Sequence, residues 1–247
     1  PVTASDAFQW NSAGISDVGK IRVINEDAFA DRPDTGLWVV ADGMGGHDAG
    51  DFASHAIIDS LNQVGPQQKL SAFIDEVEDR LLQVNQDLIV AAAEREEPTT
   101  IGSTVVALLS VQNYCACLWA GDSRAYRLCD GQMLPVSQDH SQVEELIEQG
   151  LLLREDAESH PAANVITRAV GAAEELFVDV ELVELQDGDR FLLCSDGLFK
   201  EVSEQEIAQH MQRGSCQDVC HDLVELALER GSRDNVTVVA IDFNKVK

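Results

Sequence analysis

One short apolar run in the chain ends at an aspartate and is followed by several glycines. Leu37 to Ala41 predicts a buried strand, which we expect to stop at Asp42-Gly43. Gly45-Gly46 and Gly50 follow. Glycine clusters of this kind occur at tight turns or where a ligand approaches the backbone closely. A half-buried Asp42 needs a cation, either a basic side chain or a metal ion; the alternative is a glycine-rich turn capped by a solvated aspartate.

Two further apolar runs have an acid at one end. Arg190 to Ser195 leads into Asp196, and Asp234 lies just before the strand-like run Val236 to Phe243. These acids and Asp42 are far apart in sequence, so we expect them to meet only if their strands are neighbours. Oxygen ligands suit magnesium or manganese, whereas the chain offers no thiolate or imidazole set typical of zinc. The pattern therefore predicts a site for hard divalent cations.

The composition indicates a globular protein with a strongly acidic surface. The 247 residues are 45% hydrophobic, which is enough for one large domain or two small ones. The 44 acidic and 17 basic residues give a formal charge of −27, which disfavours nucleic acid and anionic membranes as partners. No apolar run approaches the roughly 18 residues of a membrane span. We expect a cytoplasmic monomer whose six cysteines are reduced core thiols.

The spacing of apolar residues predicts the helices that frame these acids. Helical spacing covers Asp51 to Val64 and about Gln67 to Glu96, with Gly65-Pro66 between them. Ser141 and Ser203 each begin a capping-box pattern and so predict the start of a helix. A last amphipathic helix is predicted from Cys216 to Glu229.

Other apolar stretches, only some of them rich in β-branched residues, predict strands. They span Phe8 to Ile15, Ser103 to Val111, Tyr114 to Ala120, Ala125 to Cys129, Gln132 to Val136 and Leu176 to Leu185. Asp130-Gly131 is a strong hairpin signal between two of them. Helix pairs beside mainly antiparallel strands are typical of a layered α+β domain, although the pattern does not divide the strands between sheets.

Seven short stretches, in a fixed order, carry a family resemblance. They are Gly19 to Asp27 (GKIRVINED), Val40 to Gly46 (VADGMGG), Gly102 to Thr104 (GST), Gly121 to Arg124 (GDSR), Asp139 to Ser141 (DHS), Ser195 to Leu198 (SDGL) and Ser232 to Thr237 (SRDNVT). With them the chain resembles the metal-dependent protein phosphatases of the 2C type, the PPM family, and is most similar to their compact bacterial serine/threonine branch. The resemblance implies an α+β fold, a four-layer αββα sandwich with two antiparallel β-sheets flanked by helix pairs. It also implies that residues 1–247 form a single catalytic domain with a variable flap at about 141–171.

The resemblance implies a metal centre of two Mn²⁺ or Mg²⁺ ions at one edge of the sandwich. Asp42 is expected to bridge the two ions. Asp42 and Arg22 are the expected catalytic residues. Glu26 and the carbonyl of Gly43 are expected on one ion, and Asp196 and Asp234 on the other.

Four further positions match residues with roles in the family. Asp122 is expected to hold a third, weaker ion together with Asp196, although it could instead simply turn its strand. Arg22 is expected to bind the substrate phosphate and to be catalytic; the alternative is a surface salt bridge. Asp27 and Asn235 are expected to support the ligands from behind.

The implied activity is hydrolysis of phosphoserine and phosphothreonine in proteins, opposing a serine/threonine kinase. Two cations about 3.5–4 Å apart can generate a bridging hydroxide that attacks phosphorus directly, and a guanidinium can bind the phosphoryl oxygens bidentately. The alternatives are a phosphoprotein-binding member without activity and a phosphohydrolase of small metabolites. Some animal relatives have a histidine directly after the Asp-Gly pair, where this chain has Met44. We expect the leaving-group proton to come from a metal-bound water rather than from His47.

Overall fold

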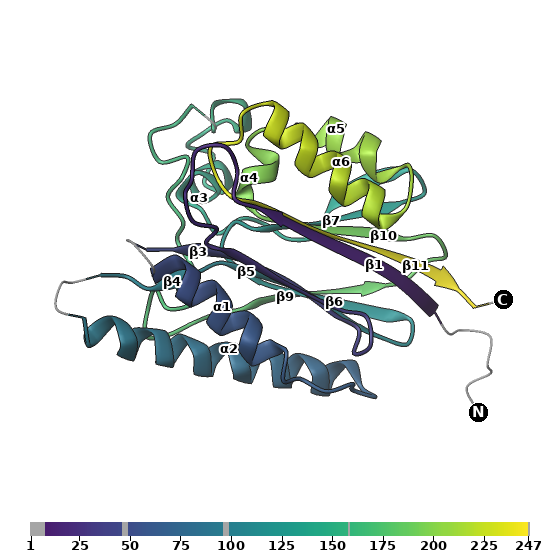
Figure 1. Cartoon of the computed structure of the whole chain (residues 1–247), viewed down its shortest axis with the longest axis horizontal. Helices are drawn as coiled ribbons and strands as arrows, with labels where there is room; N and C mark the ends of the chain where they lie inside the picture. Colours follow the sequence, from purple (N-terminus) through teal and green to yellow (C-terminus); the bar gives the residue numbers. More distant parts are fainter. Residues whose placement is uncertain (1–7, 46–48, 96–98, 158, 247) are drawn as a thin grey trace.

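The protein is a sandwich of two β-sheets with helices on the outer face of each sheet (Figure 1). The structure is a computed structural model, and it describes residues 8–45, 49–95, 99–157 and 159–246. All the strand pairings within the two sheets are antiparallel. The predicted α+β class and four-layer αββα arrangement are therefore confirmed.

The first sheet carries helices α5 (Glu204–Met211) and α6 (Cys216–Glu229) on its outer face, with the short α4 (Asp196–Phe199) at one end. Its strands, in order, are β1 (Phe8–Asp17), β11 (Val236–Lys245), β10 (Arg190–Cys194), β7 (Arg124–Cys129) and β8 (Gln132–Pro135). The predicted hairpin joins β7 to β8. Asp130 and Gly131 take the positive φ values of 50° and 76° that this two-residue turn requires.

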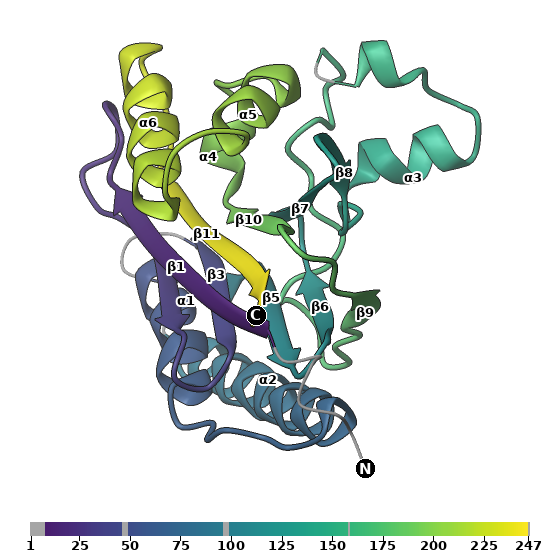
Figure 2. The same ribbon diagram turned by 90° about the vertical axis from the view of Figure 1, so that its right-hand side faces the viewer.

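The second sheet is covered by α1 (Ala49–Leu61) and the long α2 (Leu70–Ala93). Its strands, in order, are β2 (Asp27–Arg32), β3 (Leu37–Met44), β5 (Val105–Val111), β6 (Tyr114–Ala120) and β9 (Asp179–Glu184), and β4 (Gly102–Ser103) pairs with β3. Between β8 and β9 the chain forms α3 (Gln142–Glu148) and the short 3₁₀ helix η1 (Arg154–Asp156), which project beyond the sheets (Figure 2).

Aromatic side chains hold the inner faces of the two sheets together. The ring of Trp38 on β3 lies 5.8 Å from the ring of Phe243 on β11, nearly perpendicular to it. Phe191 on β10 contacts the same Phe243 ring edge-to-face at 5.6 Å. Such pairs stabilise a core beyond the burial of their area. This packing fixes β3 of one sheet against β10 and β11 of the other.

Several predicted boundaries are wrong by a few residues, and one strand is missed. β3 does not stop before Asp42-Gly43 but continues to Met44, because Gly43 and Met44 pair with β4. β2 was not predicted, since DAFADR contains no run of β-branched residues. β9 and α2 are both shorter than their predicted ranges.

The helix starts at Ser141 and Ser203 and five of the six cysteines agree with the predictions. Ser203 forms a complete capping box, whereas Ser141 accepts from the Glu144 N–H while the Glu144 carboxylate pairs with Arg154 instead. All six cysteines are free, and all but Cys129 are buried. None of the helices in the described ranges combines the length and apolar character needed to cross a bilayer.

Candidate active site

The acids singled out in the sequence gather at one edge of the sandwich. Asp42 lies near the end of β3, Asp196 begins α4 directly after β10, and Asp234 lies just before β11. Burial raises the pKa of the Asp42 carboxyl well above its ordinary value, and the negative charges of the surrounding aspartates raise it further (Asp27, Asp196, Asp122 and Asp234, in decreasing order). The strands that carry these acids were predicted to be neighbours in a sheet, and this is correct only for β10 and β11. β3 belongs to the other sheet, so the acids meet across the sandwich.

Asp27 forms the floor of the site. Its side chain is buried, and Oδ2 accepts hydrogen bonds of 2.7 Å from both the Ser195 hydroxyl and the Thr237 hydroxyl. Burial raises the pKa of Asp27 to about 7, and the two hydroxyl donors oppose that rise. Asp27 is also the cross-strand partner of Asp42. These contacts tie Asp27 to the other sheet: Ser195 directly follows β10, and Thr237 lies on β11.

Asn235 connects the start of β11 to the loop that precedes β2. Its Oδ1 accepts from the backbone N–H of Glu26 at 2.8 Å, and its Nδ2 donates to the carbonyls of Val18 and Ile24 at 2.9 and 3.1 Å. Because Asn235 is almost fully buried, these bonds fix the backbone that carries Glu26.

Glu26 and Gly43 lie where three backbone segments approach closely. The Gly43 N–H donates to the Glu26 carbonyl at 3.1 Å, and a Cβ on Gly43 would lie 2.1 Å from the Gly50 carbonyl oxygen. A Cβ on Gly50 would lie 2.4 Å from Glu26 Oε1, so the Glu26 carboxylate rests against the first turn of α1. Burial raises the pKa of Glu26, and the charge of Arg22 partly offsets this. Because a Cβ would clash at Gly43 and at Gly50, both positions require glycine.

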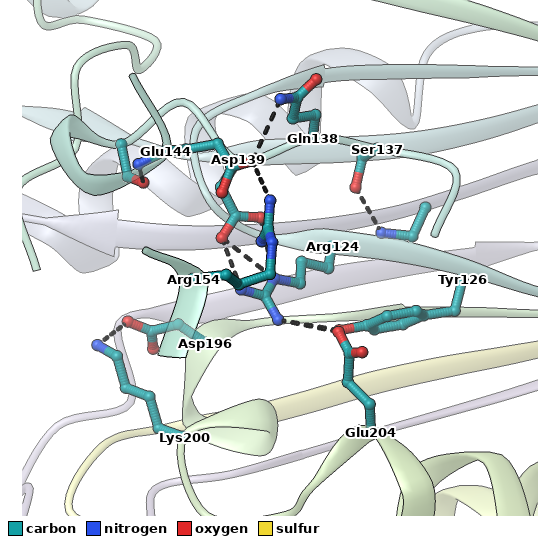
Figure 3. Close-up of polar contacts among 12 residues, drawn as sticks. Arg124, Tyr126, Ser137, Gln138, Asp139, Glu144, Arg154, Asp196, Lys200 and Glu204 are labelled. Carbon is teal, nitrogen blue, oxygen red and sulfur yellow. Dashed lines mark hydrogen bonds and ion pairs between the residues drawn. The ribbon is translucent and has the colours of Figure 1, made fainter. Parts of the chain in front are cut away.

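Two basic side chains contact the acids, each at a different aspartate. Arg22 Nη2 donates to Asp234 Oδ2 at 2.9 Å, with both side chains partly exposed. Lys200 pairs with Asp196 Oδ2 one turn along α4 (Figure 3). Sequence reasoning missed Lys200; its i,i+4 spacing from Asp196 was the available signal.

The donor set fits hard divalent cations. Four buried carboxylate oxygens have no hydrogen-bond partner among the described residues, and three of them belong to this site: Glu26 Oε1, Asp122 Oδ1 and Asp196 Oδ1. The fourth, Asp189 Oδ1, lies outside it. Buried oxygens of this kind are costly unless a cation or donor satisfies them. No three histidine, cysteine, aspartate or glutamate side chains in the described ranges already stand as a preformed metal cage. The fit therefore rests on the unpaired oxygens and the excess negative charge, and both favour Mg²⁺ or Mn²⁺.

Arg124, at the start of β7, contacts Asp139 in the loop before α3 (Figure 3) and Phe199 of α4. Its Nη2 and Nε donate to Asp139 at 2.7 and 2.9 Å, and its guanidinium lies 3.7 Å from the centre of the Phe199 ring. Asp139, the first residue of the matched stretch Asp139 to Ser141, is thus the partner of Arg124. Phe199 belongs to the same short helix as Asp196, and Asp122 lies two residues before Arg124. Arg124 therefore links the two segments that carry Asp196 and Asp122.

A cavity of about 350 Å³ opens beside Asp122 and Lys200. Its other wall includes Ser141, Val143 and Ala163 from the predicted flap segment. This wall places segment 141–171 next to the acids. Met44, the residue that departs from the animal pattern, pairs with Gly102 of β4, and His47 lies outside the described residues.

His140 supports the loop that carries Asp122. Its Nδ1 accepts from the Gly121 N–H at 3.1 Å, and its Nε2 lies 3.2 Å from Asp179 Oδ2. The ring also stacks on Trp119. Burial lowers the pKa of His140, so the neutral ring with Nδ1 as acceptor is favoured.

The chain matches one known protein family over most of its length. The family model for protein phosphatase 2C matches residues 22–227. The chain is 36% identical to the serine/threonine protein phosphatase PstP of Mycobacterium tuberculosis over 93% of its own length, but it spans only 44% of that relative.

Two solved structures are also similar. PppA of Pseudomonas aeruginosa, described as a key regulatory component of T6SS, superposes with a TM-score of 0.88 at 42% identity, covering 96% of this chain and 98% of that one. The catalytic domain of PstP in complex with two manganese ions has a TM-score of 0.85 at 33% identity, covering 96% and 99%.

Proposed function

The chain belongs to the protein phosphatase 2C family, and we propose that it is a metal-dependent phosphatase of phosphoserine and phosphothreonine in proteins. The observation that carries this proposal is a cluster of acids with unpaired buried oxygens beside a partly exposed arginine. The PstP and PppA structures support it, because they share this fold.

We propose that the acids would hold two Mn²⁺ or Mg²⁺ ions, with Asp42 a ligand of both. Glu26 and the Gly43 carbonyl would be ligands of one ion, and Asp196 and Asp234 of the other. The two manganese ions of the PstP catalytic domain support this number and type. When bound, the ions activate water as a nucleophile and neutralise the phosphoryl oxygens. Asp122, with its unpaired Oδ1, is the candidate for a third ion.

The remaining residues orient the substrate and the ligands. Arg22 uses one donor for Asp234, and its side chain is 48% exposed, so its guanidinium can bind a substrate phosphate bidentately. Asp27 and Asn235 hold the backbone of β2 and β11 that presents the ligands. We propose that segment 141–171, beside the cavity, is the flap of a single catalytic domain.

The relatives are named serine/threonine phosphatases, which supports a protein substrate. We propose phosphorylated proteins as substrates, with a serine/threonine kinase as the opposing enzyme. That the protein acts in the cytoplasm as a monomer stays a prediction.

The proposal is tested by release of phosphate from a phosphothreonine peptide with Mn²⁺. We expect activity that EDTA abolishes and that Asp196→Asn lowers by roughly a thousandfold, because bound metal contributes several kcal/mol to such reactions. Asp222→Asn is the matched control, since Asp222 is an exposed aspartate on α6. Full activity of the chelated enzyme would overturn the metal mechanism. Faster hydrolysis of sugar phosphates than of the phosphopeptide would favour a small-metabolite substrate.

A further inference from the structure

Three large apolar side chains are exposed beside Arg22. Ile21 is 68% exposed, Val23 is 94% exposed and Ile24 is 44% exposed. Single exposed hydrophobic residues are normal on protein surfaces, but contiguous apolar groups mark sites that bind a partner. Here three of four consecutive residues are apolar, and the fourth is the arginine assigned to the substrate phosphate.

The backbone of this loop is held firmly in place. The Lys20 N–H donates to the Ser232 carbonyl at 2.9 Å, and Asn235 Nδ2 donates to the carbonyls of Val18 and Ile24. The Gly19 N–H also donates to Asp17 Oδ1 at 2.8 Å. The apolar side chains are thus presented by an anchored loop, and a ligand would bind them at a small cost in ordering.

The charge of the loop differs from that of the whole chain. Residues 18–25 contain Lys20 and Arg22 and no acid, whereas the chain carries a formal charge of −27. Arg22 pairs with Asp234, so Lys20 and the remaining donors of Arg22 are the groups of this loop that can attract a phosphate, and apolar groups beside the phosphate meet apolar side chains. Acidic groups beside the phosphate would instead face a strongly acidic protein.

We propose that Ile21, Val23 and Ile24 form a docking rim for apolar residues that flank the phosphorylated residue of a protein substrate. The inference rests on the proposed phosphatase function. In an extended peptide each residue advances about 3.3 Å, so residues one or two positions from the phosphorylated one reach the rim when Arg22 holds the phosphate. The docking rim thus selects phosphopeptides with apolar flanks over those with acidic or small polar flanks.

The test compares three phosphothreonine peptides that differ only in the flanking residues: valine, serine or glutamate. kcat/KM is measured with Mn²⁺ for the wild type and for the double variant Ile21→Ser, Val23→Ser. The matched control is Leu182→Ser on β9, which removes a side chain that is 62% exposed and far along the chain from the docking rim. p-Nitrophenyl phosphate, which has no flanking residues, reports the basal activity.

We expect the wild type and Leu182→Ser to favour the valine peptide over the serine peptide by about tenfold. The double variant should lower this ratio to near one through KM, with unchanged hydrolysis of p-nitrophenyl phosphate. Equal kcat/KM for the valine and serine peptides in the wild type, or an unchanged ratio in the double variant, overturns the docking rim. Loss of all hydrolysis in the wild type, p-nitrophenyl phosphate included, overturns the proposed function itself.

Discussion

Asp27 and Asp122 are two buried acids of the same site that differ in what satisfies them. Asp27 is 4% exposed and Asp122 is 7% exposed, and burial raises the pKa of each to about 7. Yet Asp27 accepts from the hydroxyls of Ser195 and Thr237, whereas Asp122 Oδ1 has no partner among the described residues. Burial and a raised pKa therefore do not separate a supporting acid from a candidate ligand, but the missing hydrogen bond does.

The surroundings of the two acids explain the difference. Asp27 lies on β2, and its two donors belong to the opposite side of the sandwich: Thr237 lies on β11, and Ser195 directly follows β10. Asp122 lies in the turn between β6 and β7 and lines the cavity beside Lys200. One environment is a finished hydrogen-bond network, and the other leaves room for a ligand.

The largest effect on stability is expected at Asp27. Asp27→Ala removes the buried acceptor of both the Ser195 and Thr237 hydroxyls, so the free energy of unfolding should fall by about 3 kcal/mol. At pH 5, where both buried acids are largely protonated in the folded protein, Asp27→Asn keeps an acceptor oxygen and should stay within about 1 kcal/mol of the wild type. Urea unfolding of the metal-free protein at pH 5 measures both variants. Equal destabilisation by the two substitutions would show that the acceptor oxygen of Asp27 is not what stabilises the fold.

At Asp122 the opposite sign is expected without metal. Because the folded-state pKa of about 7 lies above the ordinary value, stability is greatest when the carboxyl is protonated and is lost as the pH rises through about 7. Asp122→Asn should therefore stabilise the metal-free protein at pH 8 by about 2 kcal/mol, and by less at pH 5.

Manganese should reverse the order of the two proteins. If Asp122 binds an ion, saturating Mn²⁺ should raise the melting temperature of the wild type more than that of Asp122→Asn. A variant that is less stable than the wild type without metal would contradict the contrast with Asp27.

The exposed pair of Arg22 and Asp234 should matter for activity and little for stability. Arg22→Lys keeps the charge but loses the planar fork, so kcat/KM on a phosphopeptide should fall about tenfold. The unfolding free energy should change by less than about 1 kcal/mol, because the pair is exposed to solvent. Steady-state kinetics and urea unfolding of the same preparation separate the two effects. Unchanged kinetics would mean that Arg22 only forms a surface salt bridge.

The smallest effect is expected from His140, which holds the Asp122 loop. Its pKa is lowered by burial, so the folded protein binds fewer protons than the unfolded chain below about pH 6.5, and stability falls as the pH falls. Asp179, Arg168 and Asp139 are the charged groups that influence the ring.

His140→Asn keeps an acceptor near the Gly121 N–H but cannot be protonated. Its unfolding free energy should lose about 1 kcal/mol less than the wild type between pH 7 and pH 5. Parallel urea titrations at the two pH values measure this difference. Identical pH slopes in the two proteins would remove His140 from the support of the Asp122 loop.

The sequence predicted the local parts of the site better than their extent. The hairpin at Asp130-Gly131 and the helix start at Ser203 are correct, because turn and cap preferences depend on a few adjacent residues. The end of β3 was wrong, since its last residues are held by β4, whose pairing no local pattern reveals. β2 was missed for the same reason: its strand conformation comes from pairing with β3 rather than from its own composition.

The acids at the ends of apolar runs could be read from the sequence, and they were sufficient to predict a site lined by carboxylate oxygens. The fold was needed to show that these acids meet between two sheets, that hydroxyls donate to Asp27, and that Lys200 and Arg124 lie beside Asp122. Strand and helix signals act over only a few residues. Convergence and hydrogen-bond satisfaction, in contrast, depend on how the aromatic core sets one sheet against the other.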